Sequence, residues 1–475
     1  MPLPDLIEIV PLCAPVHAEI TVPGSKSITN RALVLAALAD GEVRLEGALW
    51  SEDTQVMVDC LQRLGFEVKV ELDPNEFCNR TITVQGRGGE IPKTGTPDKP
   101  LELFVGNAGT AARFLSAMVC LGRGAYRLSG VPRMHERPQA ALFGALRELG
   151  YRVDSTNDKL PAVIHGAGPR AGKCRVSIKA SSQFASALLL CAELGGWQVE
   201  VVGENADESP YVAMTTAMVK MFPNPGGKFQ IEPDASSGSY FWAASSWGWS
   251  EPERDVQTGE NECYSVPLII VRDWPESGWQ FDAQFRQWII NFVMDSIWGG
   301  YYPEEFMVKN YGSDWRGKEV ALEADGFERR TTSRQDNLGD SIMTAIAVSP
   351  CSILPARFTD LGRLRVQECE RVVALRTELT KCGAKVIEIG DTLEVFPSQL
   401  HGAEIETYND HRMAMCFAVL GLKVPGIKLR SPACVKKTFP NFFQKLAAAP
   451  PHGLGVTILD GHTGRRLSHD ELFAD

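Results

Sequence analysis

Three stretches of the chain repeat one pattern of residues: CLQRLGFEVKVEL (residues 60–72), ALRELGYRVDS (residues 145–155) and ELTKCGAKVIEI (residues 378–389). Each combines an amphipathic helix, a glycine and a run of residues that favour a β-strand. Glycine readily adopts the left-handed conformation that ends a helix, so each glycine predicts a helix end with a strand starting two residues later. Three copies of one unit predict an internally repeated α/β fold rather than a single doubly wound sheet.

The length of 475 residues exceeds what a single small core needs and predicts two domains. A composition of 44% hydrophobic and 23% charged residues is ordinary for a soluble globular protein. No stretch approaches twenty consecutive apolar residues, and the N-terminus, MPLPDLIEIVPL, has acids where a signal peptide is apolar. We therefore expect a cytoplasmic protein without a membrane partner.

The chain carries 48 Lys and Arg residues against 59 Asp and Glu residues, a net charge of −11. This balance argues against nucleic acid as a partner, because a general nucleic-acid binder needs an extended basic surface. It still allows an anionic substrate, since a cleft can be locally positive on an acidic protein. The twelve cysteines are scattered and form no C-x-x-C pair, so we expect buried, reduced thiols without disulfides or a zinc site.

Tryptophan is concentrated in one region of the chain. Eight of the ten tryptophans lie between Trp242 and Trp315, among Gly, Pro and charged residues. We expect these aromatic side chains to fill a local core or an interface, with a second ligand site as the alternative.

The segment PGSKSITNR (residues 23–31) places Lys26, Ser27 and Arg31 at a glycine turn that leads into an apolar helix. Backbone N–H groups at a helix start favour negative charge, and the two cations add to that field. The pattern indicates an anion-binding site. A capped helix with solvated basic residues is the alternative, and the segment alone leaves both open.

Six further segments place polar and charged side chains in small-residue or apolar settings, several of them where a helix is expected to start. They are GNAGT (residues 106–110), RMHERP (133–138), SSQ (181–183), RLRVQECER (363–371), YNDHRMAM (408–415) and KKTFP (436–440). Taken singly, each is more typical of a capped helix with surface ion pairs. Their occurrence in series along one chain favours one shared anionic site.

The motifs PGSKSITNR, GNAGTAAR, PRMHERP, SSQF, EPDASSGSYF, RVQECER, YNDHRMAM and KKTFP resemble those of the 5-enolpyruvylshikimate-3-phosphate synthase family, the enolpyruvyl transferases of the shikimate pathway. They occur in the family's order from about residue 15 to about residue 445. The resemblance is poor only at the centre, over roughly residues 245–335.

The resemblance implies two similar α/β domains, each built from three βαβαββ units as an inside-out α/β barrel, with the active site in the cleft between them. One domain would be discontinuous and comprise residues 1–22 and 235–475, with the Trp-rich elaboration at about residues 245–335. Residues 23–234 would form the other domain, which carries the PGSKS, GNAGT and SSQ motifs. The cleft would close on its substrates and exclude water.

The resemblance also implies the reaction. The enolpyruvyl group of phosphoenolpyruvate would pass to the 5-hydroxyl of 3-phosphoshikimate, with release of phosphate, on the route to chorismate and the aromatic amino acids. No metal or other cofactor is implied, and we expect a monomer. The catalytic residues would be Asp340 as the base, Glu368 for proton transfer at the methylene carbon, and Lys26.

The substrate-binding residues follow from the same motifs. Those implied for 3-phosphoshikimate are Lys26, Ser27, Arg31, Ser181, Ser182, Gln183, Asp340 and Gln367. Those implied for phosphoenolpyruvate are Lys26, Asn107, Gly109, Arg137, Gln183, Arg371, Arg412 and Lys437. Arginine suits this task because its planar fork binds carboxylate and phosphate oxygens in pairs. A carboxylate among cations ionises easily, so Glu368 would need burial to keep a proton.

The chain departs from the family at three places. Gln367 stands where the family has a lysine, Arg363 where it has an asparagine, and Glu208 where it has a serine before a Lys/Gln-Pro-Tyr sequence. The first change removes a cation from the substrate site, and either Arg363 or Arg365 is a candidate to restore it.

Three other functions compete with this hypothesis. A transferase acting on UDP-N-acetylglucosamine is disfavoured because PRMHERP lacks the cysteine typical of that enzyme. An enolpyruvyl transferase with a different acceptor stays open because of the departures. A non-catalytic paralogue that binds 3-phosphoshikimate is favoured by Gln367 and disfavoured by retention of both Asp340 and Glu368.

Overall fold

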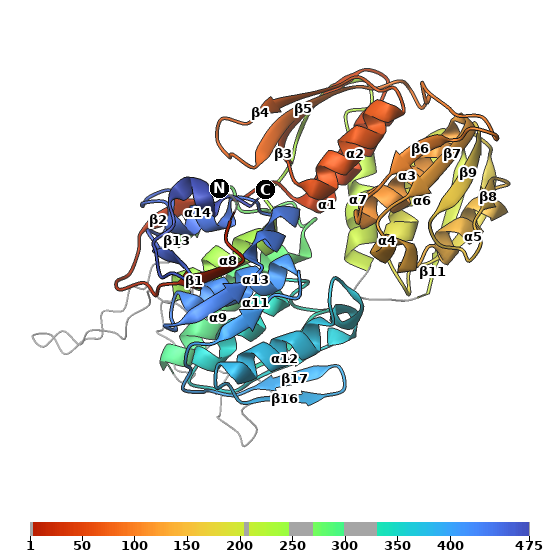
Figure 1. Cartoon of the computed structure of the whole chain (residues 1–475). Helices are drawn as coiled ribbons and strands as arrows, with labels where there is room; N and C mark the ends of the chain where they lie inside the picture. The colour runs from red at the N-terminus through yellow and green to blue at the C-terminus, as the bar shows by residue number, and fades with distance from the viewer. Residues whose placement is uncertain (1–2, 204–208, 247–268, 299–329, 475) are drawn as a thin grey trace, which may run out of the picture.

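The computed structural model describes residues 3–203, 209–246, 269–298 and 330–474, which form a mixed α/β fold (Figure 1). Its buried apolar side chains form two clusters. The first cluster, called here the first core, draws on residues 28–231. The second core combines residues 3–22 with residues 240–474, so the two ends of the chain share one interior.

Three sheets surround the first core. They are β12(Gly227–Gln230)-β3(Glu42–Leu49)-β5(Asn79–Gln85)-β4(Val68–Leu72), β6(Leu101–Phe104)-β7(Arg123–Ser129)-β9(Ala162–Ala167)-β8(Arg152–Asp154), and the pair β10(Gly172–Ser177)-β11(Trp197–Val202). In both four-stranded sheets the first pair of strands is parallel and the next two pairs are antiparallel.

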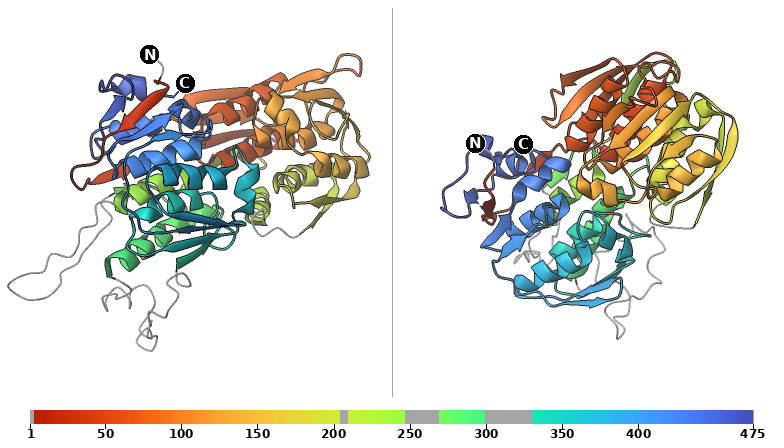
Figure 2. Two further views of the ribbon diagram at one scale, coloured as in Figure 1. Left: turned by 60° about the horizontal axis from the view of Figure 1, so that its bottom comes forward. Right: turned by 45° about the vertical axis from the view of Figure 1, so that its right-hand side comes forward.

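Three sheets with the same pairing pattern accompany the second core. They are β18(Glu404–Glu406)-β19(Ile427–Arg430)-β1(Leu6–Ile9)-β20(Ile458–Asp460), β14(Thr331–Ser333)-β15(Ala356–Thr359)-β17(Thr392–Val395)-β16(Val386–Ile389), and the pair β13(Ile269–Val271)-β2(Ala18–Ile20). Again a parallel pair precedes two antiparallel pairs in each four-stranded sheet. The N-terminal strand β1 therefore lies between two strands from the C-terminal end of the chain (Figure 2).

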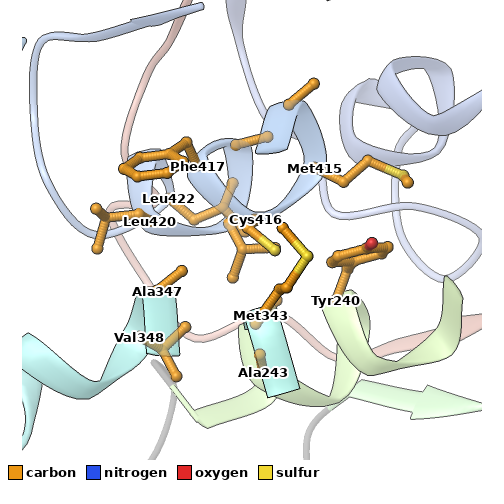
Figure 3. Packing of buried hydrophobic residues seen from close by; sticks show 14 of the residues in the cluster. Tyr240, Ala243, Met343, Ala347, Val348, Met415, Cys416, Phe417, Leu420 and Leu422 are labelled. Carbon is orange, nitrogen blue, oxygen red and sulfur yellow. The ribbon is translucent and has the colours of Figure 1, made fainter. Parts of the chain in front are cut away.

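Six helices occupy the centres of the two cores. In the first core α1(Lys26–Leu38), α3(Gly109–Met118) and α6(Gln183–Gly195) contact one another. In the second, α8(Ala235–Ser245), α11(Ile342–Val348) and α13(His411–Gly421) pack together through side chains such as Tyr240, Met343 and Cys416 (Figure 3). Every residue of α8 and α11 is buried, as their apolar and small side chains require.

The remaining helices are α2(Glu52–Arg63), α4(Pro132–Glu136), α5(Ala140–Glu148), α7(Ser209–Met221), α9(Phe285–Trp298), α12(Arg371–Lys381) and α14(Phe442–Ala447).

The repeated helix–glycine–strand pattern is confirmed. Helices α2, α5 and α12 are each followed by a glycine with a φ of +92°, +84° and +89° in turn. In each case the amide of the next residue donates back to the carbonyl five residues earlier, which satisfies the helix end. The strands β4, β8 and β16 begin two or three residues after the glycine, and each is the last strand of its sheet.

The expected inside-out barrel is not seen as a closed barrel over the described residues. The strands form six separate sheets instead, because each ladder of hydrogen bonds ends at an edge strand such as β4 or β16.

The tryptophans that can be placed serve mainly as core. Trp242 is buried and packs edge-on against Trp274 at 5.7 Å, and Trp288 stacks on Phe292 at 4.7 Å, all within or against the second core. Trp279 instead packs against the first core. Trp247, Trp249 and Trp315 lie outside the described residues. The described cysteines carry free thiols, most of them buried.

Candidate active site

The N-termini of the six central helices line one cavity of about 180 Å³ between the two cores. From the first core come the starts of α1, α3 and α6, and from the second come those of α8, α11 and α13. A helix start has N–H groups without an intrahelical partner and the positive end of a dipole, and side chains cap some of these groups, as Asp234 does for Ser237 and Asp410 for Arg412. The fold therefore creates a region of positive potential, suited to anions, before any charged side chain is counted.

The cavity gathers almost all of the predicted site residues, every one of which is in the part of the chain that the structure describes. The residues that line it are Lys26, Ser27, Arg31, Asn107, Gly109, Arg137, Ser181, Ser182, Gln183, Asp340, Gln367, Glu368, Arg412 and Lys437. Arg371 does not line it. Segments separated by hundreds of residues thus meet at one place.

The start of α1 supplies one wall. The ammonium of Lys26 lies 3.2 Å from the carboxylate of Asp53, which is buried. The Arg31 guanidinium is 1% exposed and donates to the hydroxyls of Thr215 and Ser186 at 2.7 and 3.0 Å. Arg31 is therefore held rigidly by the protein, while Lys26 is the more accessible of the two cations.

The side chains around Gly109, the second glycine of GNAGT, explain why this position has no side chain. A Cβ on Gly109 would lie 2.7 Å from a guanidinium nitrogen of Arg137 and 2.8 Å from one of Arg113. Arg137 also donates to the backbone carbonyl of Asn107 at 3.1 Å. The absence of a side chain at Gly109 therefore allows two guanidinium groups to stack against the backbone at the cavity wall.

Glu368 lies between two cations. Its carboxylate is 2.8 Å from the ammonium of Lys437 and 2.8 Å from the guanidinium of Arg371. Burial raises its pKa, but the attraction of Lys437 and Arg371 outweighs burial and holds the pKa well below its usual range. Burial alone is therefore not enough to keep Glu368 protonated in the protein without substrates.

Arg371 stands behind this carboxylate rather than at the cavity surface. It is 1% exposed, and its Nε donates to the fully buried Asp410 at 2.7 Å. Burial disfavours its charge, but Asp410 and Glu368 more than compensate and raise its pKa. Its guanidinium thus fixes the orientation of Glu368.

Asp340 lies among arginines. Its carboxylate accepts a hydrogen bond from Arg334 at 2.9 Å and lies 3.3 Å from the guanidinium of Arg412. Burial would raise its pKa, but attraction to Arg412, Arg334 and Arg371 lowers it far below the usual range. Asp340 is consequently ionised and can accept a proton.

The three residues that depart from the family pattern are Gln367, Arg363 and Glu208, and the first two line the cavity. Gln367 donates to Asp340 at 3.5 Å and accepts a hydrogen bond from Arg371. Arg363 lines the cavity, whereas Arg365 binds Glu370, Glu388 and Asp391 at 2.5–2.8 Å and does not line it. Glu208 lies outside the described residues.

Sequence reasoning missed several lining residues, among them Asp53, Gln280, Asp282 and Arg334. Asp282 accepts a hydrogen bond from the backbone N–H of Ser341 at 2.7 Å, directly beside Asp340. It lies within the Trp-rich stretch, where the resemblance to the family is poor. Arg334 could have been suspected, because it is a basic residue in the same loop as Asp340.

No group of three or more potential metal ligands occurs among the described His, Cys, Asp and Glu residues. In the same part of the chain, no helix is both long and apolar enough to cross a bilayer.

Curated relatives match this chain almost end to end. Proteins named 3-phosphoshikimate 1-carboxyvinyltransferase from Trichormus variabilis and Opitutus terrae are each 35% identical, over 463 and 472 residues. The alignments cover 93% and 94% of this chain and 98% of each relative. The protein of the same name from Vibrio cholerae is 33% identical over 457 residues, which is 91% of this chain and 96% of its own.

Solved structures share the fold. The EPSP synthase of Acinetobacter baumannii matches with a TM-score of 0.67 at 19% identity, over 95% of this chain and 99% of its own. The enolpyruvyl transferase NikO of Streptomyces tendae matches with a TM-score of 0.58 at 15% identity, over 96% and 99%. At these identities the likeness supports the fold alone.

The chain also matches the sequence pattern of a known protein family. The family named EPSP synthase (3-phosphoshikimate 1-carboxyvinyltransferase) matches residues 12–247 and 306–446. This match covers most of the chain, and it includes every residue that the motifs predict for the site. Together with the full-length curated relatives, it shows that the chain belongs to the EPSP synthase (3-phosphoshikimate 1-carboxyvinyltransferase) family.

Proposed function

We propose that the chain transfers the enolpyruvyl group of phosphoenolpyruvate to the 5-hydroxyl of 3-phosphoshikimate, giving 5-enolpyruvylshikimate 3-phosphate and phosphate. The observation that carries this proposal is one cavity in which Lys26, Arg137, Arg412 and Lys437 accompany two ionised carboxylates. Two substrates with four anionic groups need such cations, and the reaction needs a base and an acid.

The two cores support a division into two domains, residues 1–22 with 235–475 and residues 23–234. The chain would cross between them near Val22 and Asp234, where Gly24 pairs with Pro233 in an isolated bridge. Each domain would supply three helix N-termini to the cleft. Closure of the cleft would bring both halves of the site onto the substrates and exclude water.

For 3-phosphoshikimate, we assign Lys26, Ser27, Arg31, Ser181, Ser182, Gln183, Asp340 and Gln367. The start of α6 supports this assignment, because the hydroxyls of Ser181 and Ser182 stand at a positive helix end, both within 5% exposure. The Arg31 guanidinium would orient the segment from Ser27 through its hydrogen bond to the Ser27 carbonyl at 2.9 Å.

For phosphoenolpyruvate, we assign Lys26, Asn107, Gly109, Arg137, Gln183, Arg412 and Lys437, with Arg371 acting through Glu368. Arg137 and Lys437 come from opposite sides of the cavity, so one anion between them would be neutralised from both. Burial lowers the pKa of Arg137, so an anionic ligand would stabilise its charge.

The proposed chemistry begins at the acceptor. Asp340 takes the proton of the 5-hydroxyl of 3-phosphoshikimate. At the same time the hydroxyl oxygen forms a bond to C2 of phosphoenolpyruvate. Glu368 delivers a proton to C3, which becomes a methyl group. The ionised Glu368 then takes a proton back from this methyl group as the C2–O bond to phosphate breaks, which restores the C2–C3 double bond. The leaving phosphate takes the proton held by Asp340.

Substrate binding would adjust both carboxylates for these roles. Arg412, which lowers the pKa of Asp340, and Lys437, which lowers that of Glu368, are both among the residues assigned to phosphoenolpyruvate. Phosphate and carboxylate groups bound to Arg412 and Lys437 would offset their charge and raise the pKa of both side chains. Glu368 would then take up a proton when phosphoenolpyruvate binds, rather than hold one beforehand.

The deciding experiment measures phosphate release from the purified protein with phosphoenolpyruvate and 3-phosphoshikimate, each omitted in turn. Release that needs both substrates supports the proposal. Binding of 3-phosphoshikimate without turnover would indicate the non-catalytic paralogue, and failure to bind it would indicate another acceptor. Asp340→Asn should lower kcat at least about 100-fold, as expected for loss of a general base.

A further inference from the structure

We propose that Arg363 is the specificity-determining cation for the phosphate group of 3-phosphoshikimate and replaces, from one helical turn away, the charge missing at Gln367. This inference rests on the proposed function and names a binding residue that the resemblance does not assign. Arg363 lies in the 3-10 segment η7(Leu361–Val366) on the second-core side of the cavity.

The first observation is where the guanidinium lies. Arg363 Nη1 donates to the backbone carbonyl of Ala180 at 2.8 Å, across 183 residues of sequence. Ala180 directly precedes Ser181 and Ser182, whose hydroxyls stand at the N-terminus of α6. The guanidinium is therefore held beside a helix start with two hydroxyl donors, which is a combination that suits a phosphate group.

The second observation is that neither Gln367 nor Arg365 can supply the missing positive charge. Gln367 is neutral, and its amide connects Asp340 with Arg371. Arg365 is surrounded by three carboxylates, of which Glu388 and Asp391 each lie 2.8 Å away. Attraction to these carboxylates raises the pKa of Arg365 against the opposing effect of burial, so its charge is already neutralised within the protein.

The third observation is a cluster of like charges around Arg363. Burial lowers the pKa of Arg113, and repulsion from Arg137 and Arg363 lowers it further. Burial, together with repulsion from Arg363 and other cations, has the same effect on Arg137, against the pull of Glu368 and Asp53. All three side chains line a neighbouring cavity, so an anion bound at Arg363 would offset part of this repulsion, and a planar guanidinium fork matches phosphate oxygens in pairs.

A positive charge at position 363 instead of position 367 has a chemical consequence. A lysine at position 367 would present a point charge next to Asp340, whereas the glutamine donates a neutral hydrogen bond and leaves Arg334 and Arg412 to balance the charge of Asp340. Arg363 restores the total charge of the cavity but moves it toward Ser181. The chain should therefore depend on arginine at position 363 for the acceptor phosphate and tolerate a neutral side chain at position 367.

The test compares Arg363→Asn, Gln367→Lys and the double variant, with Arg365→Asn as the control for an adjacent arginine outside the cavity. Calorimetry would measure binding of 3-phosphoshikimate alone, and steady-state kinetics would measure both KM values. Arg363→Asn should weaken 3-phosphoshikimate binding 10- to 100-fold, about what loss of a charge-assisted hydrogen bond costs. It should change the KM for phosphoenolpyruvate less than about threefold.

Adding Gln367→Lys to Arg363→Asn should restore 3-phosphoshikimate affinity to within about threefold of wild type, and Arg363→Lys should fall between wild type and Arg363→Asn. Unfolding temperatures of all variants control for folding. Unchanged binding in Arg363→Asn, a larger effect on phosphoenolpyruvate, or no rescue in the double variant would overturn the inference. A wild-type protein that neither binds nor converts 3-phosphoshikimate would instead overturn the proposed function.

Discussion

The ammonium group of Lys437 lies 2.8 Å from the carboxylate of Glu368, although 69 residues separate them in sequence. The pair joins the residue assigned to proton delivery with one assigned to phosphoenolpyruvate. A ligand anion that draws Lys437 away therefore changes the protonation of Glu368. The proposed function therefore couples phosphoenolpyruvate binding to proton delivery through this contact.

Replacement of Glu368 by glutamine should destabilise the protein in a pH-dependent way. The folded-state pKa of Glu368 lies below its unfolded value, so its contribution to stability is present above the unfolded pKa and is lost as the pH falls through the folded pKa. Glu368→Gln should lower the free energy of unfolding by about 3 kcal/mol at pH 7, because Lys437 and Arg371 lose their counter-charge. Urea unfolding should show this difference shrinking below about pH 4. A difference that does not vary with pH would contradict the assigned ion pairs.

Gly109→Ala should weaken binding of phosphoenolpyruvate. The new Cβ would lie 2.7 Å from Arg137, closer than a carbon atom can approach, so the guanidinium must move. We expect the KM for phosphoenolpyruvate to rise about tenfold, a cost near 1.4 kcal/mol, with little change in the KM for 3-phosphoshikimate.

Gly144→Ala is the matched control for that substitution. Gly144 lies inside α5, and a Cβ there would meet nothing within 4 Å. This variant should keep both KM values and gain about 0.5–1 kcal/mol of stability, since alanine favours a helix. Equal effects of the two substitutions on phosphoenolpyruvate would show that Arg137 is not the cause.

Asp282→Asn should make the protein more stable at neutral pH. Burial and repulsion from Asp340 raise the pKa of Asp282 in the folded state. A group with a raised folded pKa loses its contribution as the pH rises through that value, so a neutral amide should be favoured above it. The unfolding temperature of Asp282→Asn should exceed that of the wild type at pH 8 and equal it below about pH 4. A lower unfolding temperature at pH 8 would show that attraction to Arg412 outweighs these effects.

Glu76→Ala should destabilise the protein strongly. Glu76 is 3% exposed, and its carboxylate binds the ammonium of Lys445 at 2.6 Å and the amide of Asn441 at 2.8 Å. Removing one partner leaves a cation of low exposure without compensation, so we expect a loss of about 3 kcal/mol in chemical unfolding. Glu102→Ala removes an exposed pair with Arg127 and should change stability by less than about 0.5 kcal/mol. Similar losses in both variants would contradict the role of burial.

Much of this architecture could be predicted from the sequence, because the signals are local. A glycine such as Gly65 ends a helix through its own backbone, and Ser181 marks a helix start through its neighbours in sequence. The family motifs predicted the other site residues, and all of these except Arg371 line one cavity. The direction of the pKa shift of Glu368 could not be predicted, since it depends on Lys437 and Arg371, whose distances are set only by the tertiary fold. Asp282 was missed for the same reason, because its partner Ser341 is 59 residues away.

The shared interior of the two chain ends has a consequence for synthesis. On the ribosome, residues 28–231 emerge as one continuous stretch and can complete the first core early. Strand β1 emerges before them, yet its partners β19 and β20 begin only at Ile427 and Ile458. Its backbone donors and acceptors stay unpaired through most of translation, which is the condition under which strand edges associate wrongly. Strand β1 should thus need protection in the nascent chain, and a premature stop before β19 should leave β1 without either of its partners.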